Sequence, residues 1–475
     1  MRLTLPSAHG LFTGIIKASQ MAFSSLDSEL LGPLFATDAM RAVFSDKAWL
    51  AAMLEVEGAL ARAQARLGMV PAALADALAR VEPASLDLPA LGDATAISGV
   101  PTIPFVQSVQ KQIPRDLESS FHKGATTQDI MDTALVLHMR KGLALITADL
   151  VAIIAAFSTL AQMHRTTPCV GRTYGQHAAP VTFGYKVAVW GSGLVDVADQ
   201  LPSLRSRVLT TSLGGPVGTL ASLGANGPAV AAAFAEELSL TAAPIAWHTR
   251  RSRMVEAGVW LAMLIGALAK VATDVISMAS TEVGEVAEPA MPGRGGSSSM
   301  PHKRNPVGAT VILAAQAAAK GHVITLLDAM PAAHERPAGA WHGEWHALPQ
   351  IFGLASGALQ EGRRLAEGLV VNAERMKVNL DATGGLIFAD AAAARLAQHL
   401  GREAAHALIE EAARRSRAKG LSLLQTLLED PTVDSLKDNN IATAFEIAPA
   451  VDAAAGWVDL AVADMRRVLA QLSAP

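Results

Sequence analysis

Cysteine, aromatic residues and net charge are all scarce in this chain of 475 residues. The single cysteine, Cys169, excludes an intramolecular disulfide, and a chain of this length without disulfides suits a reducing cytoplasm. The net charge of −4 gives no broad basic surface for nucleic acid or for an anionic membrane. Aromatic residues make up only 4% of the chain, whereas alanine and leucine are abundant, so the composition favours helices over sheets.

Several kinds of segment are also missing. The longest strongly apolar run without a charged residue, Ala257 to Ala269, is shorter than the roughly 18 residues that cross a bilayer. No Walker-type phosphate loop, HExxH zinc motif or paired CxxC occurs, and no repeat of fixed period is present. We therefore expect an enzyme of small molecules that uses neither metal nor organic cofactor and binds neither nucleic acid nor membrane.

Helical periodicity runs through most of the chain. Apolar residues recur at three- and four-residue spacing from Asp38 to Leu67. Four longer stretches show the same pattern: Thr127–Met163, Val181–Leu209, Arg253–Ser280 and Pro306–Met330. Helices of such length bury their apolar faces on one another, and on partner subunits, in a bundle. The sequence thus predicts an all-α protein of three helical domains with a long central helix bundle. The predicted ranges are a disordered extension at 1–25, then domains at 26–123, 124–364 and 365–475.

A glycine- and serine-rich loop leads into a basic cluster. Residues Gly293 to Pro306 read GRGGSSSMPHKRNP, so three serines stand beside His302, Lys303 and Arg304. The proline then begins a helix, whose first N–H groups we expect to be free to bind an anion. A solvated linker is the alternative, but linkers rarely combine these residue types in one run. The loop is therefore the strongest candidate for a site that acts on an anionic substrate.

A second segment, Phe121 to Thr133, carries polar side chains where a long helix begins. Thr126, Thr127 and Gln128 can donate hydrogen bonds to a carboxylate at that helix N-terminus, and His122 is the titratable member. Helix capping explains the two threonines equally well on sequence alone.

Three further segments add candidate groups. Gly171 to Gly184 contains His177, which we place on a probable helix and assign a packing role. Arg250 lies in a basic run. The sequence His334-Glu335-Arg336 fits an ordinary ion pair on a helix surface as well as it fits anion binding.

The string GSSSMPHKRNP at Gly296 to Pro306 resembles the fumarase/aspartase superfamily signature, Gly-Ser-Ser-x-Met-Pro-x-Lys-x-Asn-Pro, at every defined position. The other segments resemble further conserved regions of that superfamily, and the resemblance runs from about Leu34 to the C-terminus. It implies that Ser297 is the general base, that Lys303 stabilises an aci-carboxylate and that Asn305 holds substrate. The catalytic set is then Ser297, Lys303 and His122. The implied substrate-binding set is Thr126, Thr127, Gln128, Tyr174, Gln176, Arg250, Ser298, Met300, Arg304, Asn305 and Arg336, with no metal ligand.

One position departs from the usual superfamily pattern. Tyr174 stands where adenylosuccinate lyases and fumarases carry histidine. The 3-carboxy-cis,cis-muconate cycloisomerases are similar to this chain in having an aromatic residue there, and they share the run Gln-His-Ala-x-Pro-Val-Thr that begins at Gln176. This resemblance implies closure of a tricarboxylate, 3-carboxy-cis,cis-muconate, to 4-carboxymuconolactone in protocatechuate breakdown by the β-ketoadipate route. It also implies a homotetramer whose sites each draw on three subunits.

Two alternatives differ in chemistry. An adenylosuccinate-lyase-like or other C–N or C–X lyase shares the signature loop but should carry histidine in place of Tyr174. A non-enzymatic relative, comparable to the lens crystallins, would have lost catalytic residues, and the intact Ser297, Lys303 and Asn305 argue against it.

Overall fold

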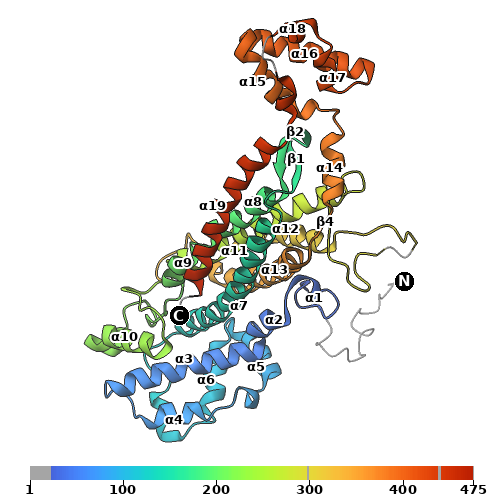
Figure 1. Ribbon diagram of the computed structural model, residues 1–475. Helices are drawn as coiled ribbons and strands as arrows, with labels where there is room; N and C mark the ends of the chain where they lie inside the picture. Colours follow the sequence, from blue (N-terminus) through green and yellow to red (C-terminus); the bar gives the residue numbers. More distant parts are fainter. Residues whose placement is uncertain (1–22, 297–298, 437–439, 474–475) are drawn as a thin grey trace, which may run out of the picture.

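Most of the chain is helical in the computed structural model, which describes residues 23–296, 299–436 and 440–473 (Figure 1). Ser297, Ser298 and most of the predicted N-terminal extension lie outside the described residues. The first described residues already contact the bundle, because the Ser24 hydroxyl lies 3.3 Å from the amide oxygen of Gln350.

Long helices form the centre of the molecule. They are α7 (Thr127–Met163), α8 (Phe183–Ala198), α11 (Ser252–Ala279), α12 (Val307–Asp328), α13 (Ala340–Gly368) and α19 (Ala448–Leu472). One continuous core of apolar residues joins them, and α12 packs along both α11 and α13. The all-α fold with a long central bundle is therefore confirmed.

Two groups of shorter helices, each with its own hydrophobic core, flank this bundle, and Figure 1 shows where the helices lie. The first gathers α3 (Asp46–Arg66), α4 (Ala73–Ala79), α5 (Leu88–Ser98), α6 (Thr102–Gln110) and α10 (Gly227–Leu238). The second gathers α15 (Ala389–Leu400), α16 (Arg402–Lys419), α17 (Leu423–Leu428) and α18 (Pro431–Asp434). Helix α19 packs on α7 and α8, although it falls in the range 365–475 predicted for the third domain. The exact domain boundaries stay a prediction.

Shorter elements complete the chain. They are α1 (Gly32–Phe35), α2 (Asp38–Val43), α9 (Leu201–Val208), α14 (Ala373–Asp381), and 3-10 turns at Pro83–Ser85, Arg115–Ser120, Ala221–Asn226, Leu386–Phe388 and Ile441–Phe445.

Local capping chemistry decided which predicted helices are continuous. Helix α7 has the predicted bounds, and the Asp129 carboxylate accepts a hydrogen bond from the N–H of Thr126 at its start. The helix predicted from Asp38 is instead two, because the Ser45 hydroxyl accepts from the N–H of Ala48 and so begins α3. The helix predicted over 181–209 is also wrong. It divides into the end of a strand, α8 and α9.

A β-hairpin occupies the segment where a helix was predicted around His177. Strands β1 (Pro168–Thr173) and β2 (Gln176–Thr182) pair antiparallel, with Thr173 opposite Gln176. The turn between them consists of Tyr174 and Gly175, both with positive φ, at 51° and 76°. Two-residue turns of this kind match the twist of paired strands, and glycine favours them. A second short pair joins β3 (Val286–Ala287) to β4 (Val370–Val371).

Helix α13 was missed by the periodicity analysis. It spans 29 residues and contains Pro349 in its interior, which argues against a helix locally. Its small residues serve packing instead. A Cβ atom added at Gly357 would lie 2.1 Å from the carbonyl oxygen of Phe35, so only glycine allows α1 to approach this closely.

In the part of the chain that the structure describes, three helices, α7, α11 and α12, are long and apolar enough to span a membrane on length and composition alone. None of these helices contains an uninterrupted apolar run of about 18 residues, because single charged residues such as Asp149 divide their apolar stretches. In the structure they form the bundle. Only 28% of the most apolar window of α12 is buried within one chain, compared with 50% for α11. An apolar face of α12 is thus left uncovered in the single subunit.

His138 on α7 is a buried histidine with a predictable effect on stability. Its side chain is fully buried against Phe44 and Trp49, and neither ring nitrogen has a partner at normal hydrogen-bond geometry among the described residues. Burial, aided by the positive charge of Lys141, lowers the pKa of His138 to about 4 from 6.5.

A pKa lowered in the folded state means that the unfolded chain binds the extra proton first. Stability is therefore complete above pH 6.5 and falls between pH 6.5 and about 4, by roughly 3 kcal/mol per subunit. The urea midpoint of the unaltered protein should fall between pH 7 and pH 5, and we expect it to fall less in His138→Phe. The exposed His406→Phe is the control. If the urea midpoint of His138→Phe falls with pH as steeply as that of the unaltered protein, the lowered pKa assigned to His138 is contradicted.

Candidate active site

The N-terminus of α7 is held by a buried carboxylate. Asp129 accepts from the N–H groups of Gly214 and Gly215, each at 2.8 Å, and Nε2 of His248 lies 2.6 Å from its Oδ1. Asp129 and His248 are both buried. With the bond from Thr126, four donors converge on this one side chain. Asp129 therefore fixes the glycine-rich turn beside the start of α7.

Arg336 reaches this same place from a segment far along the chain. Its guanidinium donates to the Thr126 hydroxyl at 3.1 Å and to the Pro216 carbonyl at 3.1 Å. Residues 334–336 form a turn before α13, so the predicted pairing on a helix surface is wrong. Thr126 caps α7 and also contacts this cation. The structure thus brings Thr126 and Arg336 together, as a carboxylate site would require.

The glycine-rich turn is a candidate functional element that the sequence analysis missed. Residues 213–219 read LGGPVGT, and Gly215 and Gly218 have positive φ. Such a run of glycines between helical patterns is the signal that could have drawn attention to it.

Gln128 does not point to an open site. The side chain is fully buried, and its amide nitrogen donates to the His248 carbonyl at 2.9 Å and to Asp132 at 3.2 Å. The prediction that Gln128 donates to a substrate carboxylate is therefore wrong for this arrangement, because its donors are used inside the protein.

A buried ionic cluster lies directly behind Gln128. Arg251 is fully buried and donates to both oxygens of Asp132, at 2.7 and 2.9 Å, and to Glu344 at 2.8 Å. Trp341 donates to Asp132 at 2.9 Å, and the guanidinium lies 4.9 Å from the centre of the Trp247 ring. The cluster joins α7, α11 and α13 at the end of the bundle nearest Thr126.

His122 is paired with a buried acid. Its Nδ1 lies 2.6 Å from Oε1 of Glu57, a residue that is 1% exposed. Burial alone would lower the pKa of His122, but the negative charge of Glu57 and its hydrogen bond outweigh this, so the pKa is raised. His122 is thus stabilised as a cation, which suits anion binding better than proton abstraction.

The β1–β2 hairpin presents its tip to solvent. Tyr174 and Gln176 are both exposed, whereas Arg172 turns inward to a bidentate ion pair with the buried Glu285, at 2.6 and 2.9 Å. Burial, and then the charge of Arg172, lower the pKa of His177. His177 therefore does not supply a positive charge here. Burial raises the pKa of the Cys169 thiol to about 12, which is consistent with a packing residue.

The signature loop is anchored on both sides. Asn305 N–H donates to the Gly295 carbonyl at 2.8 Å, and Arg294 forms an ion pair with the buried Glu361 of α13. The side chains of Lys303 and Arg304 are exposed. The remaining predicted loop residues, Met300 and Asn305, are also exposed. The loop thus offers its basic residues to a ligand or to a partner subunit.

One expectation about this loop is wrong. The N-terminus of α12 is not free to bind an anion, because the Glu288 carboxylate accepts from the N–H groups of Gly308 at 3.0 Å and Ala309 at 2.9 Å. A protein carboxylate already occupies the positive end of the helix. Lys303 and its neighbours must therefore bind anions through their side chains.

The predicted site segments do not meet within one subunit. Thr126 begins α7, and the hairpin follows the other end of the same 37-residue helix, about 55 Å away. The signature loop precedes α12, whereas Arg336 follows it, so the 22-residue helix separates them by about 33 Å. Arg250 is exposed and donates to the Ile245 carbonyl at 3.1 Å. Figure 1 shows the hairpin at the opposite end of the bundle from α3 and α5.

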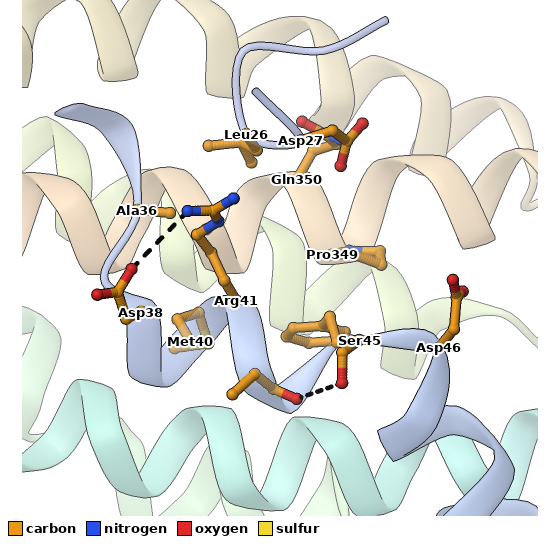
Figure 2. A pocket seen from close by; sticks show the side chains of 13 residues that line it. Leu26, Asp27, Ala36, Asp38, Met40, Arg41, Ser45, Asp46, Pro349 and Gln350 are labelled. Carbon is orange, nitrogen blue, oxygen red and sulfur yellow. Dashed lines mark hydrogen bonds and ion pairs between the residues drawn. The ribbon is translucent and has the colours of Figure 1, made fainter. Parts of the chain in front are cut away.

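A cavity between α2 and α13 is distinct from these segments (Figure 2). It has a volume of about 610 Å³, and none of the predicted site residues lines it. Three carboxylates, Asp27, Asp38 and Asp46, line it with a single guanidinium, Arg41. Excess negative charge makes this cavity unsuited to an anionic substrate. Among the described residues, no group of three or more His, Cys, Asp or Glu side chains is placed to hold a metal ion.

Comparisons with known proteins identify the family. Residues 34–321 match the lyase family, and residues 385–461 match the family described as adenylosuccinate lyase C-terminus. A 3-carboxy-cis,cis-muconate cycloisomerase from Pseudomonas aeruginosa is 44% identical over 442 residues, which cover 92% of this chain and 96% of that protein. A nitrosuccinate lyase from Streptomyces davaonensis is 42% identical, covering 94% and 97%.

Comparison with solved structures supports the same family. The crystal structure of 3-carboxy-cis,cis-muconate lactonizing enzyme from Pseudomonas putida has a TM-score of 0.86 and 42% sequence identity, and covers 92% of this chain and 98% of that one. The long-helix bundle, the signature loop and these similarities together place the protein: it belongs to the lyase family of the fumarase/aspartase superfamily.

Proposed function

We propose that the protein is a cycloisomerase that converts 3-carboxy-cis,cis-muconate to 4-carboxymuconolactone in protocatechuate degradation. The observation that carries the proposal is the intact signature loop combined with Tyr174, an aromatic residue at the hairpin tip where adenylosuccinate lyases and fumarases have histidine. The similarity to cycloisomerases at 44% and 42% identity supports it.

The chemistry needs no separate base for a nucleophile. One substrate carboxylate adds to a double bond that another carboxylate activates, so a C–O bond forms and the π electrons move into an aci-carboxylate. A proton then adds to the adjacent carbon, and the overall change is an isomerisation. We assign stabilisation of the aci-carboxylate to Lys303 and the proton transfer to Ser297. Because the nucleophile is already ionised, the absence of histidine at position 174 is compatible with the reaction.

The active site is proposed to form between subunits of a homotetramer. Thr126 and Arg336 lie at one end of α7 and α12, and the hairpin and the loop lie beyond the opposite ends. A rigid helix cannot bring its two ends together, and we therefore assign the missing segments of each site to partner chains. The uncovered apolar residues Ile324 and Leu327 of α12 provide a surface for association. We propose a cytoplasmic, cofactor-free enzyme that binds neither nucleic acid nor membrane.

A direct assay tests the proposal. Purified full-length protein is incubated separately with 3-carboxy-cis,cis-muconate, adenylosuccinate, nitrosuccinate, and fumarate with ammonia, and ultraviolet absorbance follows each reaction. We expect turnover of the first substrate only. Nitrosuccinate is included because the relative from Streptomyces davaonensis covers nearly the whole chain. Turnover of nitrosuccinate or adenylosuccinate without lactonisation would overturn the proposal, and inactivity on all four would favour a non-enzymatic relative.

The hairpin tip offers a sharper prediction. Tyr174→Trp should keep kcat/KM for carboxymuconate within about tenfold, because an aromatic side chain at an exposed turn is retained. Tyr174→His should not produce efficient adenylosuccinate cleavage, since one acid does not provide a nucleotide pocket. The measurement is kcat/KM of both variants on both substrates. Efficient cleavage of adenylosuccinate by Tyr174→His would show that this one residue sets the reaction.

A further inference from the structure

A second cavity, of about 540 Å³, lies between one face of the hairpin and helices α8 and α11. Its volume falls in the range of small-molecule sites. Thr173 and Gly175 of the hairpin line it, so the cavity borders the turn that carries Tyr174. Tyr185 and Lys186 of α8 line it from the other side.

The charges in this cavity are unequal. Three cations line it, Arg172, Lys186 and Lys270, against one carboxylate, Asp274. Lys270 holds both oxygens of Asp274, at 2.7 and 2.6 Å, and Arg172 is paired with Glu285. Asp274 also accepts from Nε1 of Trp190 at 2.7 Å. Asp274 is thus already engaged by two donors.

Lys186 is the cation without a counter-charge. It is half-buried and forms no ion pair among the residues that the structure describes. An ammonium group that lines a cavity and has no ion-pair partner can form a charge-assisted hydrogen bond to an anion bound there. The cavity therefore carries net positive charge next to the hairpin.

The hairpin otherwise brings no free cation to the proposed site. Tyr174 and Gln176 are neutral, His177 has a lowered pKa, and Arg172 is neutralised by Glu285. Charge-assisted hydrogen bonds from cations are the strongest contacts that a carboxylate can make, so a tricarboxylate is bound best where several cations meet. Thr126 lies beside Arg336, and the signature loop supplies Lys303. Lys186 would be the corresponding cation of the hairpin.

We infer that this cavity is a carboxylate subsite and that Lys186 binds one carboxylate of a tricarboxylate ligand there. The inference rests on the proposed function, because it assigns a place to a carboxylate of that substrate. The neighbouring Tyr185 side chain, which lines the same wall, is placed to contact the bound group.

The test removes the charge and keeps the length of the side chain. Lys186→Met should weaken binding of propane-1,2,3-tricarboxylate about tenfold, as expected for loss of one charge-assisted contact of about 1.4 kcal/mol. Lys186→Arg should bind within about threefold of the unaltered protein, since it retains the charge. Lys377→Met, an exposed lysine of α14, is the matched control. Calorimetry on the full-length oligomer gives the dissociation constants, and succinate serves as the dicarboxylate comparison.

Kinetics and assembly complete the test. With carboxymuconate we expect Lys186→Met to raise KM about tenfold while kcat changes less than about threefold, because the group binds and does not react. Unchanged tricarboxylate binding in Lys186→Met overturns the inference. A changed molecular mass in light scattering also overturns it, because Lys186 would then act in a subunit contact. If the unaltered protein does not lactonise carboxymuconate but its tricarboxylate binding still depends on Lys186, the proposed function fails and the subsite stands.

Discussion

Ser297→Ala is expected to lower kcat for lactone formation by about 10²–10⁴-fold, the usual contribution of a positioned acid–base group. The superfamily signature at Gly296 to Pro306 carries this expectation, because Ser297 itself lies outside the described residues. The anchors around it are described. Asn305 is bonded to Gly295, and Arg294 to Glu361, so the loop has fixed ends. Steady-state kinetics on carboxymuconate provide the measurement.

The same run of serines supplies a control for that result. Ser299 stands at one of the undefined positions of the signature, and we expect Ser299→Ala to keep kcat within a few-fold of the unaltered enzyme. Thermal unfolding and light scattering verify that both variants fold and assemble. Activity of Ser297→Ala within a few-fold of the unaltered enzyme would remove Ser297 from the mechanism.

Arg251→Met is expected to cause the largest loss of stability, about 3–5 kcal/mol, as for other buried ion pairs from which one partner is removed. The substitution leaves the carboxylates of Asp132 and Glu344 buried at the end of the bundle without their cation. Burial already raises the pKa of Glu344, and removal of Arg251 would raise it further. The expected observation is a markedly lower urea midpoint at pH 7, with partial recovery at lower pH as the carboxyls take up protons.

Two further variants separate charge from packing. The triple variant Arg251→Met, Asp132→Leu and Glu344→Leu should recover part of the lost stability, because no buried charge then remains. Arg363→Met removes ion pairs with Glu367 and Asp149, whose side chains are 49% and 27% exposed, and should lower the midpoint much less than Arg251→Met. A urea midpoint for Arg251→Met as high as that of Arg363→Met would show that leaving Asp132 and Glu344 without Arg251 does not destabilise the protein.

Prediction from local sequence patterns succeeded where residues close together in the sequence determine the local structure. The bounds of α7 follow from Thr126 and Asp129 at its start, since both capping partners lie within one turn. Such prediction failed for α13, where Pro349 weakens the helical pattern but contacts with α7, α11 and α12 determine the structure. It failed also for the hairpin, because strand pairing is a contact between segments and its turn at Gly175 resembles a loop.

The sequence by itself determined the helical class, three of the long central helices (α7, α11 and α12) and the superfamily, because amphipathic periodicity and a contiguous signature are local properties of the chain. Only the tertiary structure decided which polar groups are available. Gln128 and the N-terminus of α12 are occupied by protein partners, whereas His122 is held as a cation by Glu57, 65 residues away. It also holds Thr126 and the hairpin at opposite ends of a rigid helix within one chain. Those outcomes depend on contacts between residues distant in sequence, and no local pattern specifies such contacts.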